Sequence, residues 1–320
     1  MNNPPRIVFM GTPPFARHVL QHLVQNQYLV AGVVSAPDKP SGRGLRLNTC
    51  EVAEYARAQR FPLAQPLSLK EPAFLSQLKE WNADLFVVVA FRMLPQEVWQ
   101  LPRLCTFNLH ASLLPQYRGA APINWALIRG ETLTGVTTFV IDHQIDTGHI
   151  LLQESLPIIP DDTAGSLHDR LMTLGAHLVC RTIDALAAGA IHPKPQPSIT
   201  PLHAAPKIDK ETCRIRWDQQ PHQICNLIRG LSPHPTAFGL LQPPASEPLP
   251  IKIFQAKPIE ETHTHPCGTL LTDHKNYLHV ACRNGYVSLL DLQAAGKKRL
   301  PVKEFLLGFR TPQALFVSPP

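Results

Sequence analysis

The sequence lacks the features of several specialised protein classes. No segment of its 320 residues approaches the run of about 18 apolar residues that a membrane-spanning helix needs, and its start holds no apolar run long enough for a signal peptide. The seven cysteines are scattered, odd in number and form no Cys-x-x-Cys pair, which indicates buried thiols in a reducing compartment. We therefore expect a cytoplasmic protein without disulfides or a membrane anchor.

Acidic residues are too few to balance the basic ones. The chain has 30 Lys and Arg against 24 Asp and Glu, which gives a net charge of +6. Residues 1–208 contribute +2 of this charge, whereas the shorter segment 209–320 contributes +4. A basic excess in the smaller part favours a polyanionic partner such as a nucleic acid. Hydrophobic residues make up 44% of the chain, which is enough to bury a core.

Apolar strand-like and helix-like segments alternate through the first 190 residues. This alternation predicts an α/β domain with a mostly parallel sheet, whose catalytic loops belong at the carboxyl ends of the strands. The patterns predict strands over 6–11, 29–35, 83–91, 105–112 and 134–142, and helices over 15–25, 50–60, 72–81 and 163–189.

Prolines are abundant, with 33 in the chain, and five of them lie in 191–207. They have no Gly-X-Y period, so a collagen-like chain is excluded, and this stretch is typical of a stiff, extended connector. We expect a catalytic domain over 1–190, a linker over 191–208 and a second domain over 209–320. Short strand-like segments at 250–259, 268–272, 277–282 and 285–293 predict that the second domain is a small, OB-like β-barrel.

The densest group of polar residues follows the predicted strand at 105–112. Asn108 and His110 are two residues apart on a strand, so their side chains point to the same face and could stabilise an oxyanion together. Asp146, after the next strand, lies in an apparent Asx turn and would favour the charged form of the imidazole. No activated Ser or Cys accompanies them, which favours direct acyl transfer to an external nucleophile. An Asn and a His satisfied within the core remain the alternative.

Other motifs are less specific. The turn at 10–16 lacks the glycines of a dinucleotide-binding loop. The loop at 35–48 carries Lys39, Arg43 and Arg46, which could bind phosphates or simply be solvated.

Metal-binding patterns are incomplete. The pair His18 and His22 lacks the Glu of a His-Glu-x-x-His motif, and the segment 263–267 offers no fourth ligand. We expect no metal.

Several segments together resemble the methionyl-tRNA formyltransferases, a family that uses 10-formyltetrahydrofolate. They are, in order, RIVFMGTPPFA, APDKPSGRG, FNLHASLLPQYRGAAPINWA, IDTGHI, APKIDKETCRIRW, IRGLSPHP and GKKRLPVKEFLLGF. The resemblance covers nearly the whole chain. The asparagine, the histidine, the SLLP stretch and the aspartate are shared by all formyltetrahydrofolate-dependent transformylases, whereas the basic C-terminal half selects the tRNA family.

This resemblance implies a Rossmann-like formyltransferase domain and assigns roles to individual residues. The catalytic residues fall on Asn108, His110 and Asp146. The folate-contacting residues fall on Ser112, Leu113, Leu114 and Pro115. The basic residues expected to contact tRNA are Lys39, Arg43, Arg46, Lys297, Lys298 and Arg299. In the implied reaction, the α-amino group of methionine on the initiator tRNA attacks the formyl carbon of 10-formyltetrahydrofolate. The folate is a co-substrate, and we expect a monomer.

The chain departs from the commonest family pattern at three positions. Arg92 replaces the Gly of an Ala-Tyr-Gly motif and is expected near the folate pocket, Gln144 stands where Gly is usual, and Leu45 replaces a Lys. Two alternatives remain. One is a formyltransferase acting on an amino sugar, which would share the catalytic domain, and the other is a catalytically silent RNA-binding protein.

Overall fold

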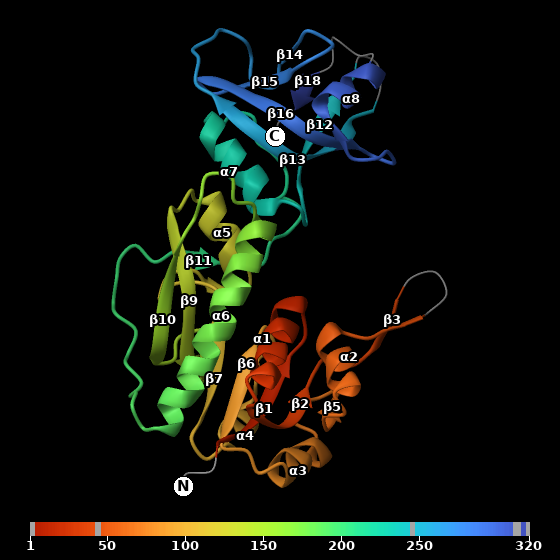
Figure 1. Ribbon diagram of the computed structural model, residues 1–320. Helices are drawn as coiled ribbons and strands as arrows, with labels where there is room; N and C mark the ends of the chain where they lie inside the picture. Colours follow the sequence, from red (N-terminus) through yellow and green to blue (C-terminus); the bar gives the residue numbers. More distant parts are fainter. Residues whose placement is uncertain (1–3, 42–45, 244–246, 310–314, 318–320) are drawn as a thin grey trace. The chain divides into compact units, whose positions relative to one another are not determined.

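The computed structural model describes residues 4–41, 46–243, 247–309 and 315–317, without the side chains of 39–48 (Figure 1). The chain divides into two compact units. The N-terminal unit holds Met1–Gly119, Leu133–Pro157 and His168–Ala204, and the C-terminal unit holds Ala120–Thr132, Ile158–Leu167 and Ala205–Pro320. Within the described residues, no helix is long and apolar enough to cross a bilayer.

The N-terminal unit is built on one sheet with strand order β10-β9-β7-β6-β1-β2-β5 among the described residues. The strands are β1 (Arg6–Gly11), β2 (Leu29–Val34), β5 (Leu63–Ala64), β6 (Leu85–Val89), β7 (Cys105–His110), β9 (Leu133–Val140) and β10 (Ile150–Pro157). The first five pair in parallel, whereas β9 runs antiparallel to both of its neighbours. The mostly parallel Rossmann-like sheet expected from the sequence is therefore confirmed.

Helices cover both faces of this sheet, as the α/β pattern predicts. They are α1 (Pro14–Gln25), α2 (Glu51–Ala58), α3 (Pro72–Glu80), α4 (Gln96–Trp99) and α6 (Ala164–Ala187). Alternate residues of β1 face opposite ways, and Val8 and Met10 pack in an apolar cluster with Phe74 of α3. Helices α1 and α6 lie side by side across the sheet (Figure 1), where the ring centroids of His22 and His177 are 4.5 Å apart.

The basic loop contains more regular structure than the sequence predicts. Strand β3 (Lys39–Ser41) pairs antiparallel with β4 (Arg46–Asn48) at its base. Arg43 lies outside the described residues, as do the side chains of Lys39 and Arg46.

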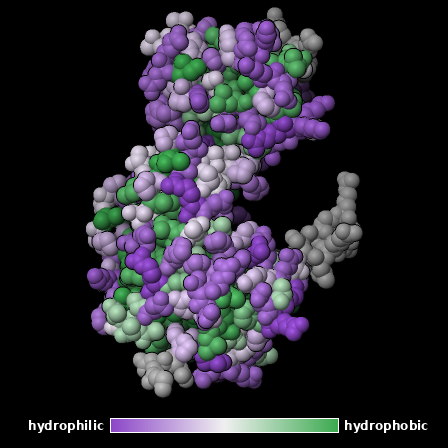
Figure 2. All heavy atoms as spheres, viewed as in Figure 1, coloured by the Kyte–Doolittle hydropathy of each residue, from purple (hydrophilic) through white to green (hydrophobic). Residues whose placement is uncertain are grey.

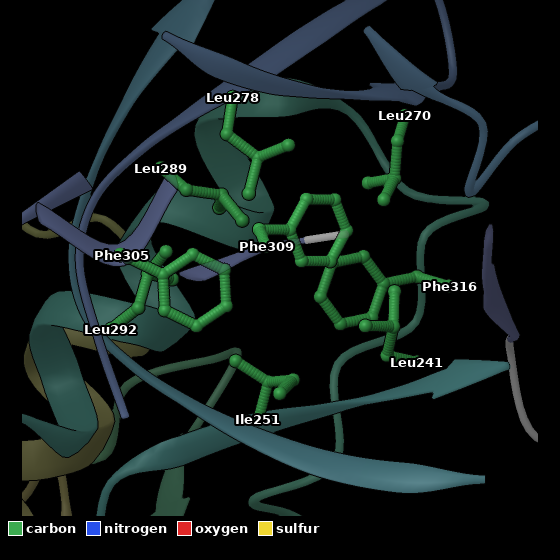
Figure 3. A pocket seen from close by; sticks show the side chains of 9 residues that line it. All are labelled: Leu241, Ile251, Leu270, Leu278, Leu289, Leu292, Phe305, Phe309 and Phe316. Carbon is green, nitrogen blue, oxygen red and sulfur yellow. The ribbon is translucent and has the colours of Figure 1, made fainter. Parts of the chain in front are cut away.

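The C-terminal unit is a nearly closed antiparallel barrel, which confirms the OB-like expectation. Its strand order is β14-β15-β16-β13-β12-β18 among the described residues, and a bridge between Thr269 and Leu315 joins the two ends. The strands are β12 (Ala237–Gln242), β13 (Leu249–Ile259), β14 (Leu270–Thr272), β15 (Leu278–Cys282), β16 (Gly285–Ala294), β17 (Leu300–Pro301) and β18 (Leu315–Val317). Figure 3 shows apolar side chains, among them Leu241, Ile251 and Leu289, converging in the interior. Hydrophilic side chains cover most of its visible surface (Figure 2).

Three helices of the C-terminal unit lie outside the segments that the sequence patterns predicted. They are α5 (Pro122–Ile128), α7 (Pro221–Leu231) and α8 (Val302–Gly308). Each begins at or just after a proline, which marks a turn in the sequence but also suits the first position of a helix. The N-terminus of α7 is further stabilised by a capping box between Gln220 and Gln223.

Candidate active site

The polar pair predicted at the end of β7 lies in the middle of the sheet, between β6 and β9. Asn108 and His110 project from the same face because they are two residues apart on a strand. His110 is only 7% exposed, and Asn108 is half-buried. The buried side-chain oxygen of Asn108 has no hydrogen-bond partner among the described residues. An unpaired buried acceptor costs about 1–3 kcal/mol, so this atom is suited to meet a substrate donor.

The imidazole of His110 is anchored through one nitrogen and open at the other. Nε2 lies 2.8 Å from the carbonyl oxygen of Tyr117, and since a carbonyl only accepts, Nε2 carries the hydrogen. Nδ1 lies 3.7 Å from Oδ2 of Asp146. That separation is too long for a hydrogen bond but short enough for the carboxylate to attract a positive charge on the ring. Nδ1 is therefore the nitrogen available for chemistry.

Asp146 reaches this position through a loop that folds back over the sheet. Because β9 is antiparallel to β7, its last residue, Val140, pairs with Phe107, whereas His110 pairs with Thr137 near the middle of β9. Strand direction alone therefore does not bring Asp146 to His110. The loop after β9 starts toward the other end of the sheet and must return to bring Asp146 to His110.

The conformation of this loop also differs from the predicted Asx turn. Asp142, not Asp146, makes the turn, since its Oδ1 accepts from the backbone N–H of Gln144 and from the hydroxyl of Thr147. Asp146 has a left-handed backbone, with φ of 56°, and its side chain is only 11% exposed. Its Oδ2 accepts a 2.8 Å hydrogen bond from the backbone N–H of Gly119. The carboxylate is held in place rather than exposed to solvent.

Gly148 permits the return of the loop. A Cβ atom at this position would lie 1.7 Å from the carbonyl oxygen of Val140, which no side chain can tolerate. Gln144, which replaces a family glycine, does not have a positive φ, so its backbone conformation does not require a glycine.

The SLLP stretch is fixed by two residues of the neighbouring strands. Thr137 on β9 is fully buried, and its hydroxyl donates to the carbonyl of Ser112 and accepts from the N–H of Leu114. Gln153 on β10 donates to that same hydroxyl and to the carbonyl of Leu114. All three hydrogen-bonding positions of the threonine hydroxyl are thus used. Ser112, Leu114 and Pro115 are buried, and Leu113 is half-buried.

The side chain of Arg92, the residue that replaces a family glycine, is bound by backbone carbonyl groups. Its guanidinium donates to the carbonyl oxygens of Pro66 and Leu67, at 2.9 and 3.0 Å, and so fixes the loop before α3. In the C-terminal unit, Lys297 and Lys298 are exposed. Arg299 is exposed as well, and it pairs with Asp291 and lies over the ring of Phe254.

Metal binding finds no support in the residues that the structure describes, where no group of three or more His, Cys, Asp or Glu side chains is placed to hold an ion. Nε2 of His263 is already used, since it donates to the carbonyl oxygens of Cys282 and Gly285.

Several residues that shape the site were not singled out from the sequence. Tyr117 and Gly119 act through backbone groups, which leave no residue-type signal. Thr137 and Gln153 are polar residues in strands, a pattern too common to indicate a role. Gln196 donates to the carbonyl oxygens of Asp146 and Gly148 from the proline-rich connector, and its only signal is a polar residue between two prolines.

Comparison with known families and proteins gives a consistent result. Residues 5–183 match the formyl transferase model, and residues 207–310 match the model of the formyl transferase C-terminal domain. The chain is 52% identical over 308 residues to the methionyl-tRNA formyltransferase of Bacteroides thetaiotaomicron, covering 95% of this chain and 96% of the relative. It is 50% identical to the enzyme of the same name from Flavobacterium johnsoniae, with 95% and 96% covered.

Solved structures share the fold at low identity. A sugar 3N-formyl transferase, solved in the presence of dTDP and 5-N-formyl-THF, superimposes with a TM-score of 0.65 at 19% identity, covering 92% of this chain and all of the other. HypX from Aquifex aeolicus, in complex with tetrahydrofolic acid, has a TM-score of 0.62 at 20% identity, covering 96% of this chain and 47% of the other.

Proposed function

Because this chain belongs to the methionyl-tRNA formyltransferase family, we propose that it transfers a formyl group from 10-formyltetrahydrofolate to methionyl initiator tRNA. The product is N-formylmethionyl-tRNA, which serves translation initiation. The observation that carries the proposal is the open Nδ1 of His110, 3.7 Å from Asp146, on the same strand face as Asn108. The enzyme acts as a cytoplasmic monomer.

The geometry supports direct transfer. The α-amino group of methionine attacks the formyl carbon, a new C–N bond forms, and the bond to N10 of the folate breaks as that nitrogen takes up a proton. Nδ1–H of His110 and the amide N–H of Asn108 donate to the oxyanion that develops on the formyl oxygen. The unpaired Asn108 oxygen accepts from the attacking amine. Asp146 attracts the positive charge of the imidazolium and assists proton removal.

A reduced folate is the formyl donor in this proposal. The two solved structures of the same fold that hold such folates support the choice of this class. Residues Ser112–Pro115 contact the folate, and the hydrogen bonds from Thr137 and Gln153 hold that stretch in position. The folate is consumed as a co-substrate, and no metal takes part in the proposed transfer.

The tRNA is bound through basic residues in both parts of the chain. In the proposed division, residues 1–190 catalyse the transfer, 191–208 connect the parts, and 209–320 bind the tRNA. The charge of +4 on 209–320 and the exposed pair Lys297 and Lys298 support this division. The loop at 35–48, with Lys39, Arg43 and Arg46, engages the acceptor end, and Arg299 contributes from the C-terminal segment.

The test is a formylation assay with purified protein and 10-formyltetrahydrofolate. One arm supplies initiator tRNA charged with methionine, a second supplies elongator tRNA charged with methionine, and a third supplies a nucleotide-linked amino sugar. We expect faster formylation in the first arm, with charged initiator tRNA, than in either of the other two arms. Formylation of the sugar without formylation of the tRNA would refute the proposal, and so would full activity of His110→Ala.

A second assay separates the tRNA contacts from the chemistry. Arg43→Ala is expected to weaken the use of charged tRNA and to make tRNA binding less dependent on salt concentration. With one phosphate contact fewer, binding of the tRNA releases fewer counterions. Formylation of a small free amine is expected to stay unchanged. Equal losses with both substrates would contradict the role of Arg43.

A further inference from the structure

The side chain of Gln196 joins two loops of the candidate active site. Its Nε2 donates to the carbonyl oxygens of Asp146 and Gly148, at 2.8 and 2.9 Å. Its Oε1 accepts from Nε and Nη2 of Arg118, at 3.1 and 2.6 Å. Both hydrogens and both lone pairs of the amide are thus used, so the group has one orientation in which every contact is satisfied.

Both loops carry atoms that hold His110 and Asp146 in position. The loop at 146–148 places the carboxylate of Asp146, and the loop at 117–119 supplies the carbonyl that anchors His110 and the N–H that Asp146 accepts. The segment after β9 has to return toward His110, and the left-handed backbone of Asp146 is uncommon for a residue with a side chain. The amide of Gln196 binds the backbone at this strained point.

The backbone around Gln196 is restricted before any contact forms. Pro195 and Pro197 flank it, and their rings fix φ at both flanking positions. Because Gln196 precedes Pro197, its own backbone favours extended conformations. The same segment pairs with β10 through Lys194 and Ile150, and the carbonyl of His203 accepts from the N–H of Tyr117. The glutamine is therefore presented to the loops by a stiff strand of connector.

We infer that Gln196 is a positioning residue for formyl transfer, which holds Asp146 opposite His110 and couples this turn to Arg118. The inference rests on the proposed function for its kinetic arm, since the assay follows formyl transfer. Gln196 touches no reacting atom in this scheme and acts only through the placement of the carboxylate.

The test compares Gln196→Ala and Gln196→Glu with a matched control, Gln77→Ala, which removes an equally half-buried glutamine from α3. Gln196→Glu keeps acceptors for Arg118 but loses both donors to the loop carbonyls. We expect kcat to fall by about 10–100-fold in both Gln196 variants, as for a misplaced catalytic group, with little change in either KM. The control is expected to behave like the wild type in both kinetics and thermal unfolding.

Hydrogen exchange followed by mass spectrometry supplies a readout that does not depend on turnover. Peptides covering 141–150 are expected to exchange faster in both Gln196 variants, while peptides covering β1 exchange as in the wild type. A double variant, Arg118→Ala with Gln196→Ala, is expected to lose less activity than the product of the single losses, because the two residues act in one chain of contacts.

Three results would overturn the inference: an unchanged kcat in Gln196→Glu, a kcat loss no greater than that of the control, or faster exchange throughout the N-terminal unit instead of in 141–150. A wild-type protein that fails to formylate any charged tRNA would refute the proposed function instead. In that case the exchange measurement still decides whether Gln196 holds the turn.

Discussion

Thr137→Val tests how Ser112–Pro115, the proposed folate-contacting stretch, is held. The substitution keeps the shape of the side chain and removes the hydroxyl that bonds Ser112, Leu114 and Gln153. Three hydrogen bonds at about 1 kcal/mol each predict a loss of about 3 kcal/mol in the free energy of unfolding. For a unit of this size, that loss lowers the unfolding midpoint by about 6–12 °C. Calorimetry on the purified variant measures it.

The neighbouring residue provides the control. Thr138 is equally buried, but its hydroxyl faces the other side of the sheet and pairs with Thr182 on α6. Thr138→Val is therefore expected to destabilise the fold without touching the SLLP stretch. We expect the KM for 10-formyltetrahydrofolate to rise in Thr137→Val and to stay near the wild-type value in Thr138→Val. Equal KM values in the two variants would refute the reasoning.

Three further predictions concern the chemistry, the tRNA and the acid stability of the fold. Asn108→Ala or His110→Ala should lower kcat by roughly 10²–10³-fold, measured in steady-state kinetics, because each removes one oxyanion donor while binding changes far less. Replacing Lys297 and Lys298 by Ala should reduce the salt slope of tRNA binding in a filter assay without changing formylation of a small amine. Hydrogen bonds from a backbone N–H and from a guanidinium hold the pKa of Asp84 below its ordinary value, so its contribution to stability is present above about pH 4 and is lost as the pH falls through the depressed pKa. Asp84→Asn should therefore lose less of its free energy of unfolding as the pH falls, measured by denaturant unfolding across the acid range. An unchanged dependence on pH in that range would contradict this role of Asp84.

The sequence alone was sufficient to predict those features that depend on residues close together in the chain. The alternation of apolar strands and helices predicted the sheet because a covered strand must be apolar on both faces. The spacing of Asn108 and His110 predicted a shared face because the strand pleat has a period of two. The strand-like segments after residue 249 predicted the barrel, and the family motifs identified the chemistry.

Only the tertiary structure decided how Asp146 reaches His110. Strand direction depends on pairing partners far apart in the chain, so the antiparallel course of β9 has no local signal. The return of the loop then depends on a close backbone approach at Gly148 and on the amide of Gln196, 50 residues away from Asp146. The connector, which the composition indicated to be a stiff spacer, thereby supplies hydrogen bonds to the loops of the proposed active site. Such contacts follow from the packing of distant segments, and no residue pattern within one segment encodes them.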